Sequence, residues 1–397
     1  MRITCNYNNG NAILKLSGRM DTTASAQAKI EIDDLLKDCG NIESLTCDAG
    51  ELEYISSSGL RVLLALAKTY KNLKITELTP QVYRIFEMTG FTKIMIVEKG
   101  LRRLSVDGCE EIGRGGVGVV YRINEDTIIK VFREDTSIEE VNTEIMMAKE
   151  AFVLGMPTAI SFDMVKVGNQ YGLVYELLNA DTLSQCVNRE PGKIDHYAKL
   201  YANLFRQLHD IHVKPDGKIP SAMIMMKEAI RIIGKYFNED QINLLMHIAD
   251  SIPPGDCLMH GDLQTKNAMV QGDELMLIDM GEVGYGHPII DLSYSYSPMM
   301  TLVGDYQHIV GMTKEQANIM WDKMIHYYFE GESEEIIQHR IQQIDVAACI
   351  RNFTWMSLSD SFPQDLLDSC RKQFYNRVES RKEHILEVCK TFNDWII

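Results

Sequence analysis

The feature that most constrains this chain is a polar loop followed by an apolar strand. The segment LMHGDLQTKNAMV precedes LMLIDMG, so Asp262, Asn267 and Asp279 stand at fixed intervals, and Asp279 ends the apolar run. Phosphoryl transfer requires a carboxylate to orient the attacking hydroxyl and oxygen ligands to hold Mg²⁺ on the phosphates. Asp262 fits the first role, and Asn267 and Asp279 fit the second. His260, just before Gly-Asp, is expected to brace the loop.

A glycine-rich stretch lies upstream of this loop. In EEIGRGGVGVVYRI, Gly113, Gly115 and Gly118 have the G-x-G-x-x-G spacing and Val120 follows, while the next run, TIIKVF, contains Lys130. A dinucleotide-binding fold would begin a helix directly after the glycines, but both runs have strand patterns. A glycine-rich hairpin with a lysine on the next strand is typical of kinases. We therefore predict that these five residues bind ATP.

A kinase also needs a glutamate that holds the lysine and a hinge that binds adenine. The apolar run QYGLVYELL ends near Glu176 and Leu178, whose backbone groups are expected to form the hinge. A helical pattern begins at Ser137, and Glu144 is its favoured glutamate because it lies 13 residues before Pro157, the usual spacing in small-molecule kinases. The other candidates on this helix are Glu139, Glu140 and Glu150.

The 397 residues suffice for two or three domains, and the net charge of −16 is unevenly distributed. Residues 1–107 carry a net charge of +1 and residues 108–397 a net charge of −17, which predicts a domain boundary there. An acidic second part argues against nucleic-acid binding. The nine cysteines are scattered, and neither a signal peptide nor a membrane-length apolar run is present. We expect a cytoplasmic protein with reduced thiols and no membrane partner.

The first 107 residues show strand and helix patterns in the order ββαβαβα, which predicts a small α/β domain with helices against one sheet. In ISSSGLR, three serines stand where a strand ends and a helix begins. Free backbone amides and the helix dipole favour an anion there, so a phosphate on Ser58 would be stabilised. Ordinary N-capping by serine is the alternative.

The segments LSGRMDTTAS, YISSSGLRVLL and EMTGFTKIM resemble a STAS domain, the fold of bacterial anti-sigma factor antagonists, over about the first 100 residues. In that family a partner kinase phosphorylates the Ser or Thr just before the glycine of this motif, and the matching residue is Ser58. The family often has Asp two residues earlier, where this chain has Ser56. The resemblance implies a protein partner at the surface around Ser58.

The second part resembles the kinase-like superfamily, and within it the aminoglycoside phosphotransferase and choline kinase branch. HGDLQTKN, IDMG and YGHPIIDLSY carry this resemblance, which covers about residues 108–330. It implies an α+β two-lobed protein-kinase-like fold, with a β-rich N-lobe (108–178) and a larger helical C-lobe (179–397). Gln264 departs from the branch, which often has His there. Only 11 residues separate Asp279 from Asp291, which favours a small-molecule acceptor over a peptide.

The expected function is ATP- and Mg²⁺-dependent phosphorylation of a hydroxyl of a small molecule, with the STAS domain as a regulatory, partner-binding part. The alternative is an anti-sigma factor antagonist-like regulator whose kinase domain acts as a phosphorylation or nucleotide switch. Intact Lys130, Asp262, Asn267 and Asp279 weigh against a third possibility, a non-catalytic nucleotide sensor. The C-terminal aromatic residues form either core or a cage for a quaternary ammonium group: Trp321, Tyr327, Tyr328 and Phe329.

Overall fold

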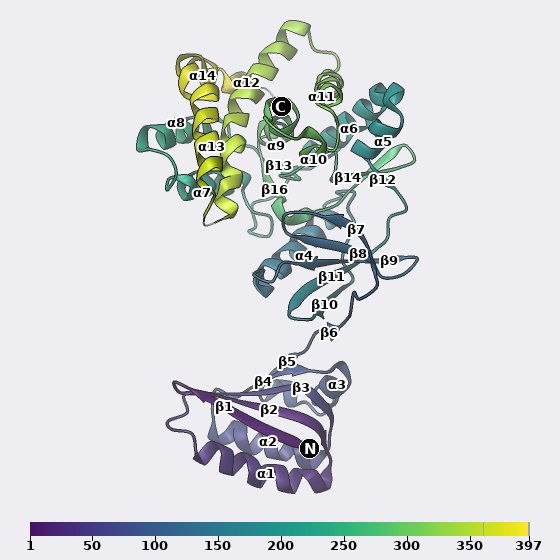
Figure 1. Cartoon of the computed structure of the whole chain (residues 1–397), viewed down its shortest axis with the longest axis vertical. Coiled ribbons are helices and arrows are strands. Elements are labelled where there is room, and N and C mark those ends of the chain that lie inside the picture. Colours follow the sequence, from purple (N-terminus) through teal and green to yellow (C-terminus); the bar gives the residue numbers. More distant parts are fainter. Residues whose placement is uncertain (360, 396–397) are drawn as a thin grey trace. The chain divides into compact units, whose positions relative to one another are not determined.

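The computed structural model describes residues 1–359 and 361–395 and divides the chain into two compact units (Figure 1). The first unit consists of Met1–Asn124, Ile128–Thr136 and Phe162–Val174. The second consists of Glu125–Thr127, Ser137–Ser161 and Tyr175–Ile397. Within the described ranges, no helix combines the length and hydropathy that spanning a bilayer requires.

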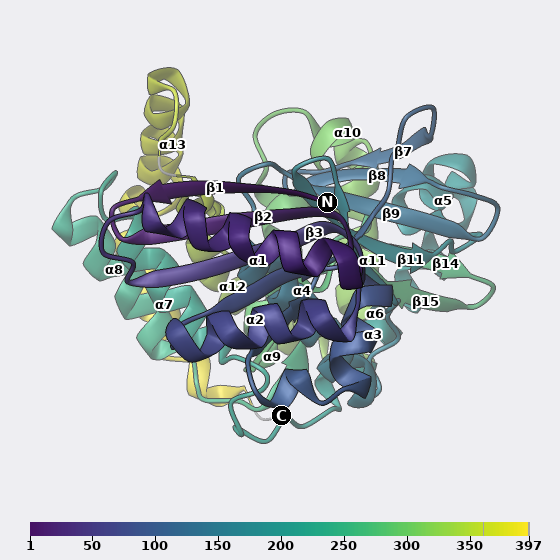
Figure 2. The same cartoon turned by 90° about the horizontal axis from the view of Figure 1, so that it is seen from below.

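The first unit begins with a five-stranded sheet in the order β1-β2-β3-β4-β5. The first two strands are antiparallel and the remaining neighbours are parallel. Helices α1 and α2 lie side by side along one face of this sheet (Figures 1 and 2). The elements are β1 (Arg2–Asn8), β2 (Asn11–Met20), α1 (Thr22–Lys37), β3 (Ser44–Ile55), α2 (Ser57–Thr69), β4 (Lys74–Leu78), α3 (Pro80–Met88), η1 (Phe91–Lys93) and β5 (Ile96–Lys99).

Local chemistry explains where these elements begin and turn. Asn9 and Gly10 have positive φ angles and form the two-residue turn between β1 and β2. Asp21, Ser56 and Thr79 each accept a backbone N–H bond at the start of a helix. The apolar faces of the sheet and helices bury a single cluster of side chains, so this region has its own core.

A second sheet, in the order β6-β10-β11-β9-β8-β7, lies mostly within the same unit. The hairpin pairs β7/β8, β8/β9 and β10/β11 are antiparallel, whereas β6 and β10 are parallel. Buried side chains of its own strands, including Ile129, Val165 and Val174, form a small core. The strands are β6 (Arg102–Arg103), β7 (Glu110–Arg114), β8 (Gly118–Arg122), β9 (Thr127–Phe132), β10 (Asp163–Val167) and β11 (Gln170–Glu176).

The second unit is mainly helical, and its core includes the fully buried Tyr201, Trp321 and Phe353. Helix α12 packs on α7, α8 and α9, and α6 packs on α11. The α-helices are α4 (Ile138–Val153), α5 (Leu183–Arg189), α6 (Ile194–His209), α7 (Ala222–Ile233), α8 (Glu239–Ser251), α9 (Pro288–Tyr296), α10 (Tyr306–Ile309), α11 (Lys314–Tyr328), α12 (Glu334–Thr354), α13 (Gln364–Arg377) and α14 (Lys382–Cys389).

Short strands and single helical turns connect these helices and carry the polar loop. The strands form a three-stranded sheet, β12-β14-β15, and an antiparallel pair, β13 and β16. The strands are β12 (Asp181–Thr182), β13 (Cys257–Met259), β14 (Ala268–Gln271), β15 (Glu274–Leu277) and β16 (Gly284–Gly286). The turns are η2 (Pro191–Lys193), η3 (Met280–Glu282), η4 (Ser297–Thr301), η5 (Trp355–Leu358), η6 (Glu379–Arg381) and η7 (Phe392–Asp394).

The expected fold class is confirmed: an α/β STAS fold precedes a kinase-like fold with a β-rich first part and a helical second part. The sequence order ββαβαβα missed the last strand of the first sheet, β5. That strand has only four residues, and it is mostly exposed, so it lacks the apolar alternation by which strands are predicted.

Candidate active site

The loop between β13 and β14 holds Asp262, and buried groups from distant segments fix its backbone. The carboxylate of Asp291 on α9 is fully buried and accepts the backbone N–H bonds of His260 (3.3 Å) and Gly261 (2.9 Å). The His260 ring accepts the Asp262 N–H at Nδ1 (3.2 Å), and its Nε2 donates to the carbonyl oxygen of Ile278 (3.1 Å). His260 therefore braces the loop from inside the fold.

Gly261 is required by the same loop. Its φ angle is +79°, and a Cβ atom there would lie 2.0 Å from the carbonyl oxygen of Glu282. Because the obstacle is backbone, a larger residue could fit only if the loop moved. The glycine therefore brings Asp262 and the segment at Glu282 close together.

Three side chains donate hydrogen bonds to the carboxylate of Asp262. Gln264 Nε2 and Arg351 Nη2 donate to Oδ1 at 2.8 and 2.9 Å, and Asn267 Nδ2 donates to Oδ2 at 3.2 Å. The Asp262 side chain retains 23% exposure, so it is accessible. These bonds fix the orientation of an accessible carboxylate, which a group that orients a reacting hydroxyl requires.

Asn267 and Asp279 flank the hairpin of β14 and β15. In its register Ala268 faces Leu277, and Ile278 donates its N–H to the carbonyl oxygen of Asn267 (3.0 Å). Asp279 follows directly with a φ angle of 65°, an uncommon conformation that marks many functional sites. An amide and a carboxylate are the hard oxygen donors that Mg²⁺ prefers, so these two residues fit such an ion.

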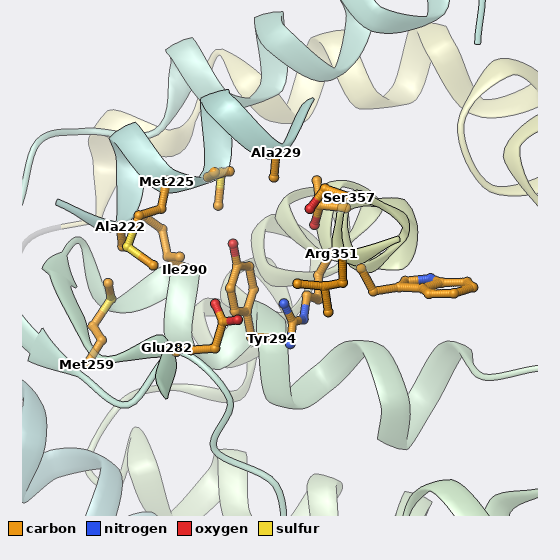
Figure 3. Close-up of a pocket in the computed structure, with 14 residues that line it drawn as sticks. Ala222, Met225, Ala229, Met259, Glu282, Ile290, Tyr294, Arg351 and Ser357 are labelled. Atoms are coloured by element: carbon orange, nitrogen blue, oxygen red, sulfur yellow. The ribbon is translucent and has the colours of Figure 1, made fainter. Parts of the chain in front are cut away.

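A small hollow of about 50 Å³ adjoins the loop that holds Asp262 (Figure 3). Gly261 and Glu282 form one part of its wall and Arg351 of α12 another, and Figure 3 shows the Tyr294 ring between these two side chains. The Arg351 guanidinium lies 4.5 Å from the centre of that ring. Burial alone would lower the pKa of Arg351, but the charges of Asp262, Tyr294 and Glu282 raise it, so the residue is a cation.

Whereas Arg351 is charged, the surroundings of Glu282 favour its neutral form. Burial raises the pKa of its carboxyl group, the nearby cation of Arg351 lowers it, and Asp262 and Asp279 raise it further. The net shift is upward, so the environment favours the neutral acid more than water does.

The predicted phosphate-binding residues lie in the first unit. Gly113 is the second-last residue of β7. Gly118 is the first residue of β8, and a Cβ atom there would lie 2.3 Å from the carbonyl oxygen of Val131. Gly115 lies between the strands with open space around it. Val120 on β8 pairs with Lys130 on β9. The sequence pattern thus becomes the expected glycine-rich hairpin with a lysine on the next strand.

The remaining predicted nucleotide residues lie in the second unit. Glu144 on α4 is 9% exposed and accepts a hydrogen bond from the Tyr175 hydroxyl (3.2 Å). Glu176 ends β11, and Leu178 follows, its carbonyl oxygen accepting the Ala180 N–H (2.9 Å). The pairing of Glu144 with Lys130 and the binding of adenine by the hinge stay predictions.

At the start of α2, the capping residue is Ser56. Its side chain accepts the N–H of Gly59 (3.2 Å), and it is only 8% exposed. Ser58 therefore is not the cap. It is partly exposed in the first turn of the helix, so capping does not occupy its hydroxyl.

Sequence reasoning missed Glu282 and Arg351. Glu282 follows Asp279 by three residues, a proximity that could have indicated it. Arg351 lies 89 residues beyond Asp262 in a long helix, and no local pattern distinguishes it from other arginines.

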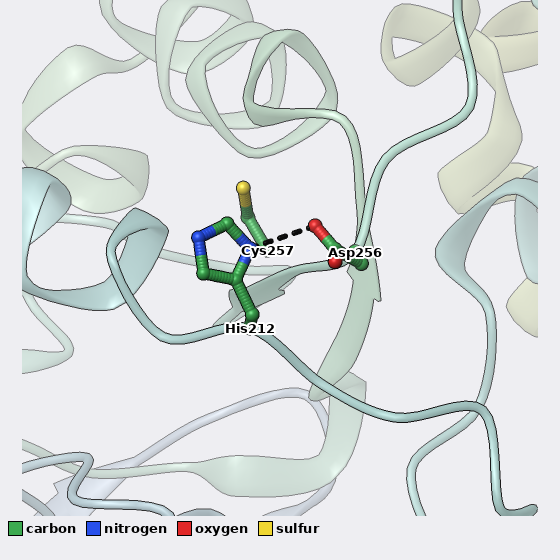
Figure 4. Close-up of side chains that lie close together, drawn as sticks. All are labelled: His212, Asp256 and Cys257. Atoms are coloured by element: carbon green, nitrogen blue, oxygen red, sulfur yellow. Dashed lines mark hydrogen bonds and ion pairs between the residues drawn. The ribbon is translucent and has the colours of Figure 1, made fainter.

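A further cluster of possible metal ligands lies at His212, Asp256 and Cys257 (Figure 4). His212 Nδ1 already binds Asp256 Oδ1 at 2.8 Å, and both side chains are exposed. Burial raises the pKa of the Cys257 thiol to about 11, which opposes the thiolate that a metal needs. We assign no function to this cluster.

Two family models match the chain: the STAS domain over residues 2–104 and the phosphotransferase enzyme family over residues 109–324. Two curated proteins match the first region over 101 residues. The putative anti-sigma factor antagonist BtrV of Bordetella bronchiseptica is 34% identical, with 24% of this chain and 85% of that protein covered. The anti-sigma F factor antagonist of Paenibacillus polymyxa is 27% identical, with 24% and 84% covered.

A choline/ethanolamine kinase family protein from Mesorhizobium loti is a similar solved structure, with 14% identity, a TM-score of 0.46, and 71% of this chain and 92% of that chain covered. The two family models and the observed folds define a phosphotransferase domain preceded by an anti-sigma factor antagonist-like STAS domain. The chain belongs to the phosphotransferase enzyme family.

Proposed function

We propose that this protein transfers the γ-phosphoryl group of ATP to a hydroxyl of a small molecule, with Asp262 orienting that hydroxyl. The observation that carries the proposal is the accessible Asp262 carboxylate, fixed by three side chains beside a hollow that could hold an acceptor. The family match supports it. The domain boundary at residues 107 and 108 is part of the same proposal, as is action in the cytoplasm.

In this proposal the acceptor oxygen attacks the γ-phosphorus. A new P–O bond forms as the bond to the bridging β-phosphate oxygen breaks, ADP leaves with that electron pair, and the hydroxyl proton passes to Asp262. Gly113, Gly115, Gly118 and Val120 would place backbone close to the phosphates, and Lys130 would neutralise their charge. Glu144 would hold Lys130 in position. Glu176 and Leu178 would bind adenine.

Asn267 and Asp279 would hold Mg²⁺, which when bound neutralises phosphate charge. The test is incubation of the full chain with ATP and Mg²⁺ in the presence of hydroxyl compounds, with ADP and phosphorylated product measured. Lys130→Ala should weaken nucleotide binding or turnover. If millimolar ATP with Mg²⁺ causes no thermal shift, the protein is not a kinase of this type.

A second proposal concerns the STAS domain. We propose that it binds a protein partner through the surface around Ser58 and that Ser58 is the phosphoacceptor; the similarity to anti-sigma factor antagonists supports both. Labelled ATP followed by peptide mass spectrometry of wild type, Ser58→Ala and Asp262→Asn tests this. Label on Ser58 that disappears in Asp262→Asn would favour the regulatory alternative, in which the phosphotransferase domain acts on its own STAS domain. No label on wild type would exclude such self-modification.

A further inference from the structure

Building on the phosphotransferase function above, we propose that Arg351 binds an anionic group of the acceptor. The acceptor would then be a hydroxyl compound whose anionic group lies a few bonds from the hydroxyl that reacts. Arg351 would be a specificity-determining residue. The inference rests on the guanidinium's place in the wall of the hollow and its direct contact with Asp262.

The guanidinium has donors to spare. Arginine carries five N–H donors, and in the described part of the chain the hydrogen bond that this guanidinium makes is the one from Nη2 to Asp262. The side chain is 19% exposed and lines the hollow, so the donors not used by Asp262 can meet an acceptor. A planar guanidinium matches the geometry of carboxylate and phosphate groups, to which it can donate two parallel bonds.

The distance between the two groups limits the acceptor. Arg351 Nη2 and Asp262 Oδ1 are 2.9 Å apart. A hydroxyl at Asp262 and an anionic group at Arg351 must therefore be close in the acceptor molecule, as they are in a 2-hydroxy or 3-hydroxy acid. Apolar side chains such as Met225, Met259 and Trp355 line the rest of the hollow and would contact an apolar part of a larger acceptor.

The net charge of the hollow's lining depends on the protonation state of Glu282. Arg351 and Glu282 are the charged side chains of its described lining. Since burial favours the neutral form of Glu282, that residue would repel an anion less than an exposed carboxylate would.

An aromatic cage for a quaternary ammonium group has little support. Trp321 is 1% exposed and packs on Tyr296, and the Tyr327 hydroxyl donates to Asp195 (2.8 Å). Neither lines the hollow. The ring of Tyr294 does line it, but the Arg351 cation already lies over that ring and would repel a second cation.

The test uses the full chain with ATP and Mg²⁺ and three pairs of acceptors that differ by one carboxylate: L-serine and ethanolamine, glycerate and ethylene glycol, 2-hydroxyhexanoate and 1-pentanol. Initial rates give kcat and KM for each compound, and thermal shift with ATP alone reports nucleotide binding. We expect at least one acid to be phosphorylated with a kcat/KM about 100-fold or more above that of its partner.

Three variants locate the effect. Arg351→Met should raise KM for the preferred acid about 10-fold to 100-fold, the scale of a lost charged hydrogen bond, with a smaller change in kcat. Arg351→Lys keeps the positive charge but loses the planar guanidinium that can donate two parallel hydrogen bonds, so it should give an intermediate KM. This variant keeps the inference testable if Arg351→Met does not fold. Arg371→Met is the matched control: this exposed arginine pairs with Asp368, and its loss should change no rate.

The outcomes separate the inference from the function beneath it. Absence of ATP binding would overturn the phosphotransferase function itself. Nucleotide binding with phosphorylation of the uncharged or cationic partners at equal or higher kcat/KM would overturn the role of Arg351 alone, as would an unchanged KM in Arg351→Met. Nucleotide binding without phosphorylation of any acid at 20 mM, well above the usual range of KM, would also overturn it.

Discussion

Asp262 in the second unit and Ser58 in the first, two residues with proposed chemical roles, are held in different ways. The Asp262 carboxylate accepts hydrogen bonds from three side chains, one of them 89 residues away. At the start of α2, Ser56 does the capping, and in the described part of the chain the Ser58 hydroxyl makes no hydrogen bond. The difference teaches that the Asp262 carboxylate, the proposed catalytic group, is held in one orientation by the fold, whereas the hydroxyl of Ser58, the proposed phosphoacceptor, is not. Substitutions should accordingly have large effects in the first region and small ones in the second.

The largest effect is expected at Asp279. Asp279→Asn removes a carboxylate that we propose to hold Mg²⁺, so Mg²⁺-dependent turnover should be abolished. Asp273→Asn is the control, because this aspartate is 92% exposed in the turn of the same hairpin. Rates measured across a Mg²⁺ titration check this, and equal activity in the two variants would contradict the metal assignment.

Substituting one glycine in each region, Gly261 and Gly59, compares how strongly the two backbones are constrained. Gly261→Ala would bring a Cβ atom within 2.0 Å of the Glu282 carbonyl oxygen at a positive φ angle, so it should destabilise its unit by about 3 kcal/mol. Gly59→Ala would bring a Cβ atom within 2.7 and 2.8 Å of the buried side chains of Ile55 and Met20, which rather than backbone would have to shift, and should cost about 2 kcal/mol. Calorimetry of the full chain measures both, and equal losses would mean that the loop of Asp262 is no more constrained than the start of α2.

The stability of the second unit should depend on pH through Glu282. Burial raises the pKa of Glu282 in the folded state, so its protonated form stabilises the fold at pH values below the unfolded pKa of about 4.3. This contribution is lost as pH rises through the folded pKa. Glu282→Gln should therefore unfold at a higher temperature than wild type at pH 7, and the difference should shrink toward pH 4. A difference independent of pH would contradict the effect of burial.

The smallest effects are expected in the serines before Gly59. Ser56→Ala removes the cap and should cost about 1 kcal/mol. Ser58→Ala should change stability by less than about 0.5 kcal/mol, because the hydroxyl is not needed by the fold. Thermal unfolding of the two variants checks the order, and a larger loss in Ser58→Ala would mean that this hydroxyl has a structural role.

The sequence could predict what is local. Asp262, Asn267 and Asp279 lie within one short segment, and the same segment forms the loop and hairpin that bring them together. Arg351 could not be predicted, because it reaches Asp262 only through the packing of α12 on α9. The strand β5 was missed because an exposed edge strand of four residues carries no apolar alternation.

The most direct test of the catalytic role measures ATP affinity and acceptor-dependent ADP formation in wild type and Asp262→Asn. If Asp262 orients the acceptor hydroxyl, the dissociation constant for ATP should change less than about twofold while turnover falls about 100-fold or more, the scale of an acid–base residue. Equal losses of affinity and turnover would instead show that Asp262 only maintains the fold. Undiminished turnover would show that another residue orients the hydroxyl.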